Sequence, residues 1–88
     1  MKETFVIKNE LGLHARAAAK FVEITNAFDS EIIVTVGNST FDGKSIMGLL
    51  SIGIKKGEEI IVSISGRDEE DAFKAIDKLI NEDLLEME

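Results

Sequence analysis

The stretch Glu59–Ser65, EIIVSIS, limits the possible folds of this chain more than any other segment. Every second residue from Ile60 is apolar, and the alternate positions hold Ile61, Ser63 and Ser65. Because successive side chains of a strand point to opposite faces, this pattern predicts a strand with one apolar face. The helices of the chain are therefore expected to cover one face of a sheet.

Turn residues divide the rest of the sequence into further segments of strand or helix character. Gly37-Asn38 separates two β-rich runs and predicts a hairpin. Ser45 and Asp68 are residue types that cap helix N-termini. The predicted strands are Thr4–Lys8, expected to be buried, Glu31–Val36, Ser39–Asp42 and Glu59–Ser65. The predicted helices run from Ala15 to about Asn26, from Ile46 to near Gly53, and onward from Glu69 with Ala72, Ile76, Leu79 and Ile80 as its buried stripe.

The order of these segments is β-α-β-β-α-β-α within 88 residues. A chain of this length makes one domain, residues 1–88, with one modest core. Hairpins combined with helices on a small sheet predict an α+β fold in two layers, with the helices on one face.

Composition excludes several classes of function. Ten basic and 17 acidic residues give a net charge of −7, which argues against binding to nucleic acid or to an anionic membrane. The chain has no cysteine and one histidine, so no metal site is expected. No apolar run reaches the length of a membrane-spanning helix, and Met1–Thr4 lacks the apolar core of a signal peptide. A cytoplasmic protein is therefore expected.

The only histidine, His14, stands where the first helix is predicted to begin. A helix N-terminus carries unpaired N–H groups and a partial positive charge, which together favour a bound anion. The N–H groups of Ala15, Arg16 and Ala17 are expected to point toward a group held by the imidazole, and the guanidinium of Arg16 suits phosphate. The helix end also disfavours a protonated ring, and a neutral imidazole can attack a phosphoryl group. These residues predict phosphoryl chemistry at His14.

Two simpler interpretations stay open on these residues alone. A lone histidine near a helix start is more often a surface residue or a local cap than a nucleophile. His-x-Arg is also a weak motif by itself. The histidine therefore needs support from a second part of the sequence.

That support comes from two blocks taken together. GLHARAAAKF at 12–21, followed by KSIMGLLSIG at 44–53, resembles the HPr family, the histidine-containing phosphocarriers of the phosphoenolpyruvate-dependent sugar phosphotransferase system. The similarity covers the whole chain, including its length and the order of its elements. It implies an open-faced β-sandwich, in which a four-stranded antiparallel sheet is covered on one face by three helices.

The resemblance also implies roles for individual residues. His14 would take a phosphoryl group on Nδ1 from phosphorylated enzyme I and pass it to sugar-specific IIA domains, with Arg16 stabilising the phosphate. Ser45 matches the serine that an ATP-dependent HPr kinase/phosphorylase modifies in many relatives, and a transcriptional regulator would be a further partner. The chain would act as a covalent carrier that needs no cofactor, and not as an enzyme with turnover.

The sequence departs from the family pattern at two positions. Ala17 stands where the family usually has proline, which restores one N–H donor and loosens the helix start by about 0.5–1 kcal/mol. Glu23 stands where many relatives carry a basic residue, and Lys20 is a candidate to compensate. These changes put the preference for partners in question and leave the nucleophile in place.

The short helix after Ser45 is unusually apolar for its length. Leu49 and Ile52 are expected in the core. The side chains that do not fit there are expected to form an exposed docking patch beside His14, because exposed apolar patches tend to be interfaces. The expected partner-binding residues are Lys20, Ile46, Met47 and Leu50. On the simpler interpretation the whole helix is buried and Ser45 is only its N-cap.

A regulatory HPr-like paralogue is the alternative function. Such a protein would act mainly as a binding module controlled by phosphorylation of Ser45, with His14 idle. Acid lability separates the two functions, because phosphohistidine is labile to acid and phosphoserine is not. A monomer is expected, since a carrier gains nothing from hiding its docking face.

Overall fold

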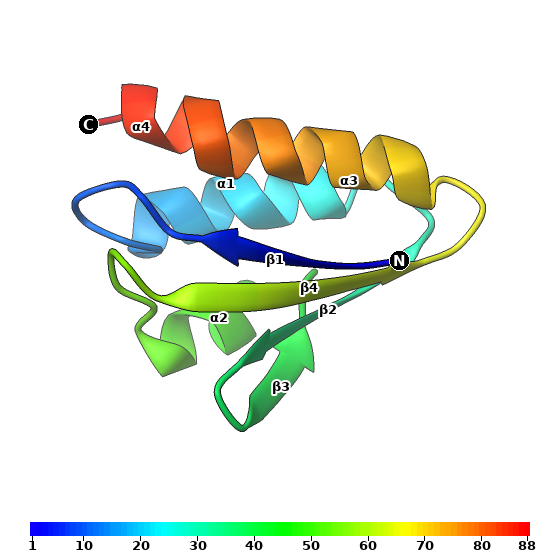
Figure 1. Ribbon diagram of the computed structural model, residues 1–88, viewed down its shortest axis with the longest axis horizontal. Helices are drawn as coiled ribbons and strands as arrows, with labels where there is room; N and C mark the ends of the chain where they lie inside the picture. Colours follow the sequence, from blue (N-terminus) through cyan, green and yellow to red (C-terminus); the bar gives the residue numbers. More distant parts are fainter.

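Strands and helices alternate along the chain, and the computed structural model describes all 88 residues. Figure 1 shows a twisted sheet with helices packed along it. The strands are β1 (Lys2–Val6), β2 (Glu31–Val36), β3 (Ser39–Asp42) and β4 (Glu59–Ser65). The helices are α1 (Ala15–Thr25), α2 (Ile46–Ile52), α3 (Glu69–Lys78) and α4 (Leu84–Glu86), with a π-helical turn at Leu79–Asp83 between the last two.

The segments α3, π-helical turn and α4 form one continuous helical rod (Figure 1). The residues at its two junctions keep right-handed helical dihedral angles. Leu79, Ile80 and Leu84 are fully buried, so the rod keeps one face on the core through the π-helical turn. The three helices of the predicted fold are therefore α1, α2 and this rod. No helix of the structure has both the length and the apolar content needed to cross a membrane.

The four strands form one antiparallel sheet in the order β1-β4-β2-β3. In β4, Ile60 lies opposite Phe5 of β1, and Val62 lies opposite Val34 of β2. These four side chains are buried, whereas the alternate position Ser63 is only half-buried. The one-faced pattern predicted for Glu59–Ser65 is confirmed, and with it the α+β open-faced sandwich.

The core lies between the apolar face of the sheet and the helices. Eighteen buried apolar residues form a single cluster. Phe21 of α1, Leu49 of α2 and Ile76 of α3 are fully buried in it. Because burial of a side chain of this size contributes about 1.5–3 kcal/mol, each helix is held on the sheet by at least one such anchor. Ile52, which was expected in the core, is half-buried and packs against the cluster.

The first strand differs from its prediction in both bounds and burial. β1 ends at Val6, and Phe5 is its only buried residue. An edge strand has one neighbour, and the helices cover only one face here, so β1 is solvated on its other face. The prediction of Thr4–Lys8 as a buried strand was therefore wrong. Ile7 is buried just beyond the strand, where its backbone N–H donates to the carbonyl of Glu58 at 3.0 Å.

The ends of α2 follow the sequence prediction. The hydroxyl oxygen of Ser45 accepts a hydrogen bond from the N–H of Gly48 at 3.2 Å, which is an N-cap contact. Gly53 ends the helix with φ of +66°, a left-handed conformation that glycine adopts without strain. The predicted N-cap and helix end are both confirmed.

Asp68 does not cap α3 with its side chain, in contrast to the prediction. Its carboxylate accepts hydrogen bonds from the backbone N–H groups of Asp29 and Ser30, at 2.8 and 3.0 Å, and from the Ser30 hydroxyl. These bonds, the hydroxyl's first, hold the pKa of Asp68 below its ordinary value. Asp68 thus fastens the loop before β2 to the loop before α3, because the two loops lie side by side in the fold.

Candidate functional site

His14 is the N-cap residue of α1, and its ring is not used for capping. The residue has extended dihedral angles, φ −69° and ψ 177°, and its side chain makes no hydrogen bond to the helix end. Its side chain is 27% exposed, while the Nε2 atom is buried and has no hydrogen-bond partner. The interpretation of His14 as a residue whose side chain caps the helix is therefore wrong.

The first turn of α1 leaves backbone donors beside the ring. The N–H of Ala18 donates to the carbonyl of His14 at 2.8 Å and is the first in the helix with an intrahelical acceptor. The N–H groups of Ala15, Arg16 and Ala17 precede it and have no acceptor within the helix. This is the arrangement in which a helix N-terminus holds an anion.

Arg16 lies on the exposed side of the same turn. Its guanidinium takes part in none of the ion pairs of the structure. A shallow groove runs along this face of α1 and is lined by Arg16, Ala19, Lys20, Glu23 and Met87. The charge of Arg16 is thus free to meet an anion at the surface, whereas Lys20 is paired with Glu23 at 3.6 Å.

The loop before His14 is fixed by a close backbone contact. Gly12 has φ of +65°, and a Cβ atom at this position would lie 2.4 Å from the carbonyl oxygen of Ile54. The next residue, Leu13, is buried and donates its N–H to the same oxygen at 2.9 Å. His14 therefore follows a segment anchored on the chain between α2 and β4.

A second anchor comes from Asn9, a buried polar residue in the same loop. Its side-chain amide donates to the carbonyl of Gly12 at 2.7 Å, and the N–H of Gly12 donates to the carbonyl of Asn9 at 3.1 Å. The loop is thereby closed on itself directly before His14. The sequence analysis did not identify this role of Asn9, because asparagine is also a common turn residue.

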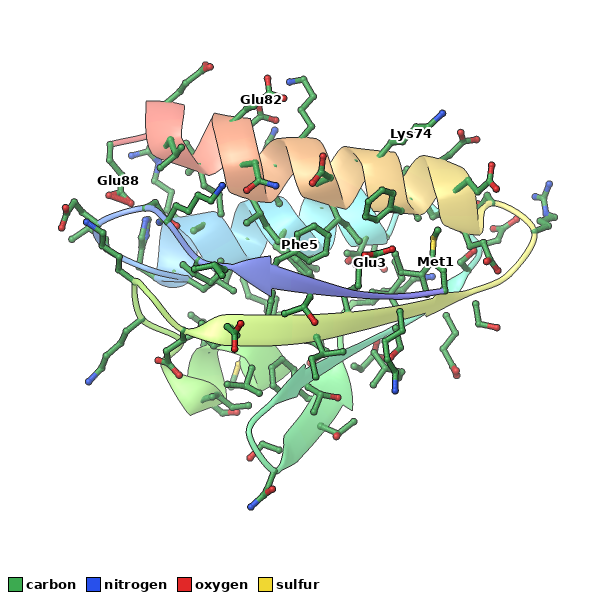
Figure 2. All side chains as sticks on the ribbon, in the orientation of Figure 1. Met1, Glu3, Phe5, Lys74, Glu82 and Glu88 are labelled. Carbon is green, nitrogen blue, oxygen red and sulfur yellow. The ribbon has the colours of Figure 1, made fainter.

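Glu88 reaches the loop from the far end of the helical rod. Figure 2 shows its carboxylate beside the loop that connects β1 to α1. Glu88 Oε1 accepts from the amide of Asn9 at 2.7 Å and lies 4.0 Å from His14 Nε2, and the N–H of Leu11 donates to both carboxylate oxygens at 3.1–3.2 Å. The hydrogen bond from Asn9, first, and those from backbone N–H groups hold the pKa of Glu88 below its ordinary value. No sequence pattern predicts the contact between Asn9 and Glu88, because these two residues are 79 positions apart in the chain.

The predicted docking residues differ in their exposure to solvent. Met47 and Leu50 on α2 are 74% and 38% exposed. Ile46 is half-buried and packs against the core. It is therefore not part of the exposed patch, although the sequence analysis placed it there. α2 packs directly against α1, which carries Lys20 and Arg16. The exposed apolar residues and the site at His14 therefore belong to neighbouring helices.

The arrangement suits a covalently bound anion better than a metal ion. No group of three His, Cys, Asp or Glu side chains is placed to hold a metal ion. Free N–H groups at a helix end and an unpaired guanidinium beside an imidazole are groups that can hold a phosphate.

Comparison with known proteins decides the family. The sequence model that describes the PTS HPr component phosphorylation site matches residues 1–82. The chain belongs to the HPr family. HPr of Neisseria meningitidis is 44% identical over 81 residues, which cover 92% of this chain and 91% of the relative. The chain is thus a phosphocarrier protein of the phosphotransferase system by family, and the resemblance inferred from its two sequence blocks is confirmed.

Solved HPr structures share the fold over the full chain. HPr-C-His from Thermoanaerobacter tengcongensis superposes with a TM-score of 0.92 at 43% identity, over 100% of this chain and 98% of that one. The HPr dimer from the same organism superposes with a TM-score of 0.76 at 46% identity, over 96% of this chain and 98% of that one.

Proposed function

We propose that His14 carries a phosphoryl group on Nδ1, which it takes from phosphorylated enzyme I and passes to sugar-specific IIA domains. The observation that carries this proposal is the orientation of the ring at the N-cap of α1. Nε2 is buried and has no hydrogen-bond partner, which leaves Nδ1 as the accessible ring nitrogen, and the residue directly precedes the free N–H groups of the first turn. A phosphocarrier needs this combination of a reachable nucleophile and an anion-stabilising helix end.

The transfer is a displacement at phosphorus. The lone pair of Nδ1 attacks the phosphoryl group of the donor and forms the N–P bond, while the bond from phosphorus to the donor atom breaks and leaves its electron pair there. The ring keeps the proton on Nε2 and becomes cationic. The negative charge on the phosphoryl oxygens meets the N–H groups of Ala15, Arg16 and Ala17 and the guanidinium of Arg16. The same steps in reverse deliver the group to the acceptor.

Ser45 is proposed as a regulatory phosphorylation site. A phosphate on this residue would lie at the N-terminus of α2 and add about −1.5 to −2 charge units beside the docking residues Met47 and Leu50. Because enzyme I must dock on this face to reach His14, the added charge weakens that docking. An HPr kinase/phosphorylase would place the group, and a transcriptional regulator would read it.

The departures from the family pattern concern the partners. Lys20 is occupied by its ion pair with Glu23, so it offers a weaker positive charge to a partner than a free lysine. We therefore propose a narrower set of IIA partners than for relatives with a basic residue at position 23. Ala17 is fully buried and keeps its N–H free for phosphate.

The experiment is phosphorylation with phosphoenolpyruvate and enzyme I. The parent chain and a Ser45→Ala variant are expected to acquire acid-labile phosphate, whereas His14→Ala acquires none. Label that resists acid, or label on His14→Ala, contradicts the proposal. Absence of label on a parent chain that the ATP-dependent kinase still modifies at Ser45 would favour the regulatory module.

The carrier is expected to work as a monomer. The docking residues on α1 and α2 have to stay accessible to the donor and to the acceptors in turn. Sedimentation at micromolar protein is expected to give the mass of one chain, and twice that mass would contradict this expectation. The dimer known for the Thermoanaerobacter relative makes the measurement informative.

A further inference from the structure

The thioether of Met47 is a reactive group on the docking face whose chemistry the proposed function does not use. The chain has three methionines and no cysteine, tryptophan or tyrosine. Met47 is 74% exposed, whereas Met1 is 41% exposed and Met87 is half-buried. Because exposure governs how readily a sulfur atom is oxidised, Met47 is the side chain of this protein most open to an oxidant in solution.

We propose that Met47 is a site of reversible oxidation, at which a hydroperoxide converts the thioether to a sulfoxide and thereby weakens docking to enzyme I. This rests on the proposed function, because the docking residues of α2 belong to it. A second modification site is thus added to the helix that Ser45 caps.

The step is the transfer of one oxygen atom from the hydroperoxide to sulfur. A lone pair of the Met47 sulfur attacks one oxygen of hydrogen peroxide, and the O–O bond breaks with its electron pair on the leaving hydroxide. The attacked oxygen then passes its proton to that hydroxide. Sulfur is oxidised to the sulfoxide, and hydrogen peroxide is reduced to water.

The sulfoxide can form without loss of the fold. Leu49 of the same helix is fully buried, and Ile46 packs against the core cluster. These two residues, together with the cap at Ser45, hold α2 on the sheet. An oxygen atom added to the exposed side chain of Met47 leaves all of these contacts in place.

The same oxygen atom changes what the docking face offers to a partner. Met47 and Leu50 are the exposed apolar side chains of α2. A thioether is flexible and apolar and adapts to several partners, whereas a sulfoxide is polar and costs free energy when it is buried without a hydrogen-bond donor. Oxidation therefore weakens docking without the added charge that a phosphate on Ser45 would bring.

Met87 provides an internal comparison. It also lies near the candidate site, because it lines the groove along α1 together with Arg16 and Lys20. Its side chain packs against the core cluster, so its sulfur is less accessible than that of Met47. Oxidation at Met87 is therefore expected to be slower.

The test treats the parent chain, Met47→Leu and Met87→Leu with hydrogen peroxide, which is removed before enzyme I is added. Leucine keeps a similar apolar volume and has no sulfur to oxidise. Mass spectrometry of peptides gives the order in which the methionines gain oxygen, and titration calorimetry gives the affinity for enzyme I. Each chain is compared only with its own untreated sample.

Met47 is expected to gain oxygen before Met1 and Met87. The affinity of the parent and of Met87→Leu for enzyme I is expected to fall about tenfold on treatment, the size of losing one anchor of an interface, while Met47→Leu keeps its untreated affinity. Methionine sulfoxide reductases of both epimer specificities are expected to restore the parent. The free energy of unfolding in urea is expected to stay unchanged.

Equal rates of oxidation at the three methionines, or an equal loss of affinity in treated Met47→Leu, overturn the inference. A parent that regains its mass under the reductases without regaining its affinity also overturns it. If the untreated parent binds enzyme I but His14 acquires no phosphate, the carrier function fails, while the titration still decides the effect of oxidation. An untreated parent that does not bind enzyme I contradicts both.

Discussion

The backbone N–H of Leu13 donates a 2.9 Å hydrogen bond to the carbonyl of Ile54, and this bond joins the two sequence blocks that characterise the chain. Leu13 directly precedes the candidate phosphoryl acceptor, and Ile54 directly follows the block that contains Ser45. The loop that carries His14 is thus hydrogen-bonded to the segment that directly follows α2. The candidate acceptor and the exposed residues of α2 therefore lie on segments that are joined directly.

Replacing Gly12 by alanine is expected to break this junction. The new Cβ would lie 2.4 Å from the Ile54 oxygen, at a residue with φ of +65°, so both steric overlap and backbone strain oppose it. We expect the free energy of unfolding in urea to fall by about 2–4 kcal/mol. Gly37→Ala is the control, because φ is +59° but no atom lies within 4 Å. That variant is expected to lose only about 1–2 kcal/mol; equal losses would show that the contact with Ile54 has no effect.

Arg16→Gln is expected to lower phosphoryl acceptance without lowering stability. The guanidinium is exposed and unpaired, so its removal is expected to change the free energy of unfolding by less than about 0.5 kcal/mol. Loss of its charge beside the phosphoryl group is expected to slow acceptance by about 10²-fold, the size of losing one donor to a developing anion. The rate of acid-labile labelling measures this. The control is Lys74→Gln, on the outer side of the rod in Figure 2, which is expected to keep the parent rate. If Arg16→Gln and Lys74→Gln slow acceptance equally, the cause is the change in net charge and not the position of Arg16.

Three substitutions at Ser45 separate its structural role from its regulatory one. Ser45→Ala removes the contact with the Gly48 N–H and is expected to cost about 1 kcal/mol of unfolding free energy. Asn and Asp are both good N-caps and are expected to retain it. Only Ser45→Asp adds a negative charge to the docking surface, so it alone is expected to slow acceptance from enzyme I. If Ser45→Asp accepts the phosphoryl group from enzyme I as fast as Ser45→Asn does, a negative charge at Ser45 does not regulate this acceptance.

Met47 and Leu49 are neighbours on α2 with opposite predicted effects. Met47 is 74% exposed and Leu49 is fully buried. Leu49→Ala is expected to cost about 2–5 kcal/mol of unfolding free energy, and Met47→Ala less than about 0.5 kcal/mol. Met47→Ala is instead expected to raise the concentration of chain at which enzyme I is half-saturated. A Met47→Ala variant with parental kinetics would remove α2 from the docking surface.

Asp68 gives a pH-dependent contribution to stability. Hydrogen bonds from Ser30 and Asp29 hold its pKa in the folded chain below the ordinary 3.8, so the unfolded chain takes up this proton first as pH falls. The carboxylate therefore stabilises the fold above that value, and the contribution is lost as pH falls through the folded pKa. Urea unfolding is expected to show Asp68→Asn less stable than the parent at neutral pH, with the difference shrinking in acid. Glu59→Gln, at an exposed carboxylate, is the control for the removal of one negative charge from the chain.

The sequence predicted what depends on local periodicity and missed what depends on distant contacts. The alternation at Glu59–Ser65 and the cap at Ser45 are set by residues close together in the chain, and both are confirmed. The edge position of β1 depends on which strand pairs with which, and a short apolar run does not contain that information. Asp68 was predicted from its residue type as a cap, but the approach of Ser30 provided a better partner.

The candidate site shows the same division. His14 and Arg16 were found because a helix N-terminus, an imidazole and a guanidinium are adjacent in sequence. Asn9 and Glu88 were not predicted at the site. Asparagine is a common turn residue, and Glu88 is one of many acidic residues near the end of the chain. Only the folded chain brings them together, across 79 positions.

The π-helical turn at Leu79–Asp83 determines in which direction around the helix axis the side chains of residues 84–88 point. A π-helical turn accommodates one extra residue, and in an α-helix one residue corresponds to a rotation of about 100° and a rise of about 1.5 Å. Deleting Asn81 would convert the turn to ordinary α-helix and rotate the last residues by that angle. Leu84 would leave the core, and Glu88 would leave the loop that holds His14. The irregular turn therefore acts as the spacer that brings the end of the rod into register with the site.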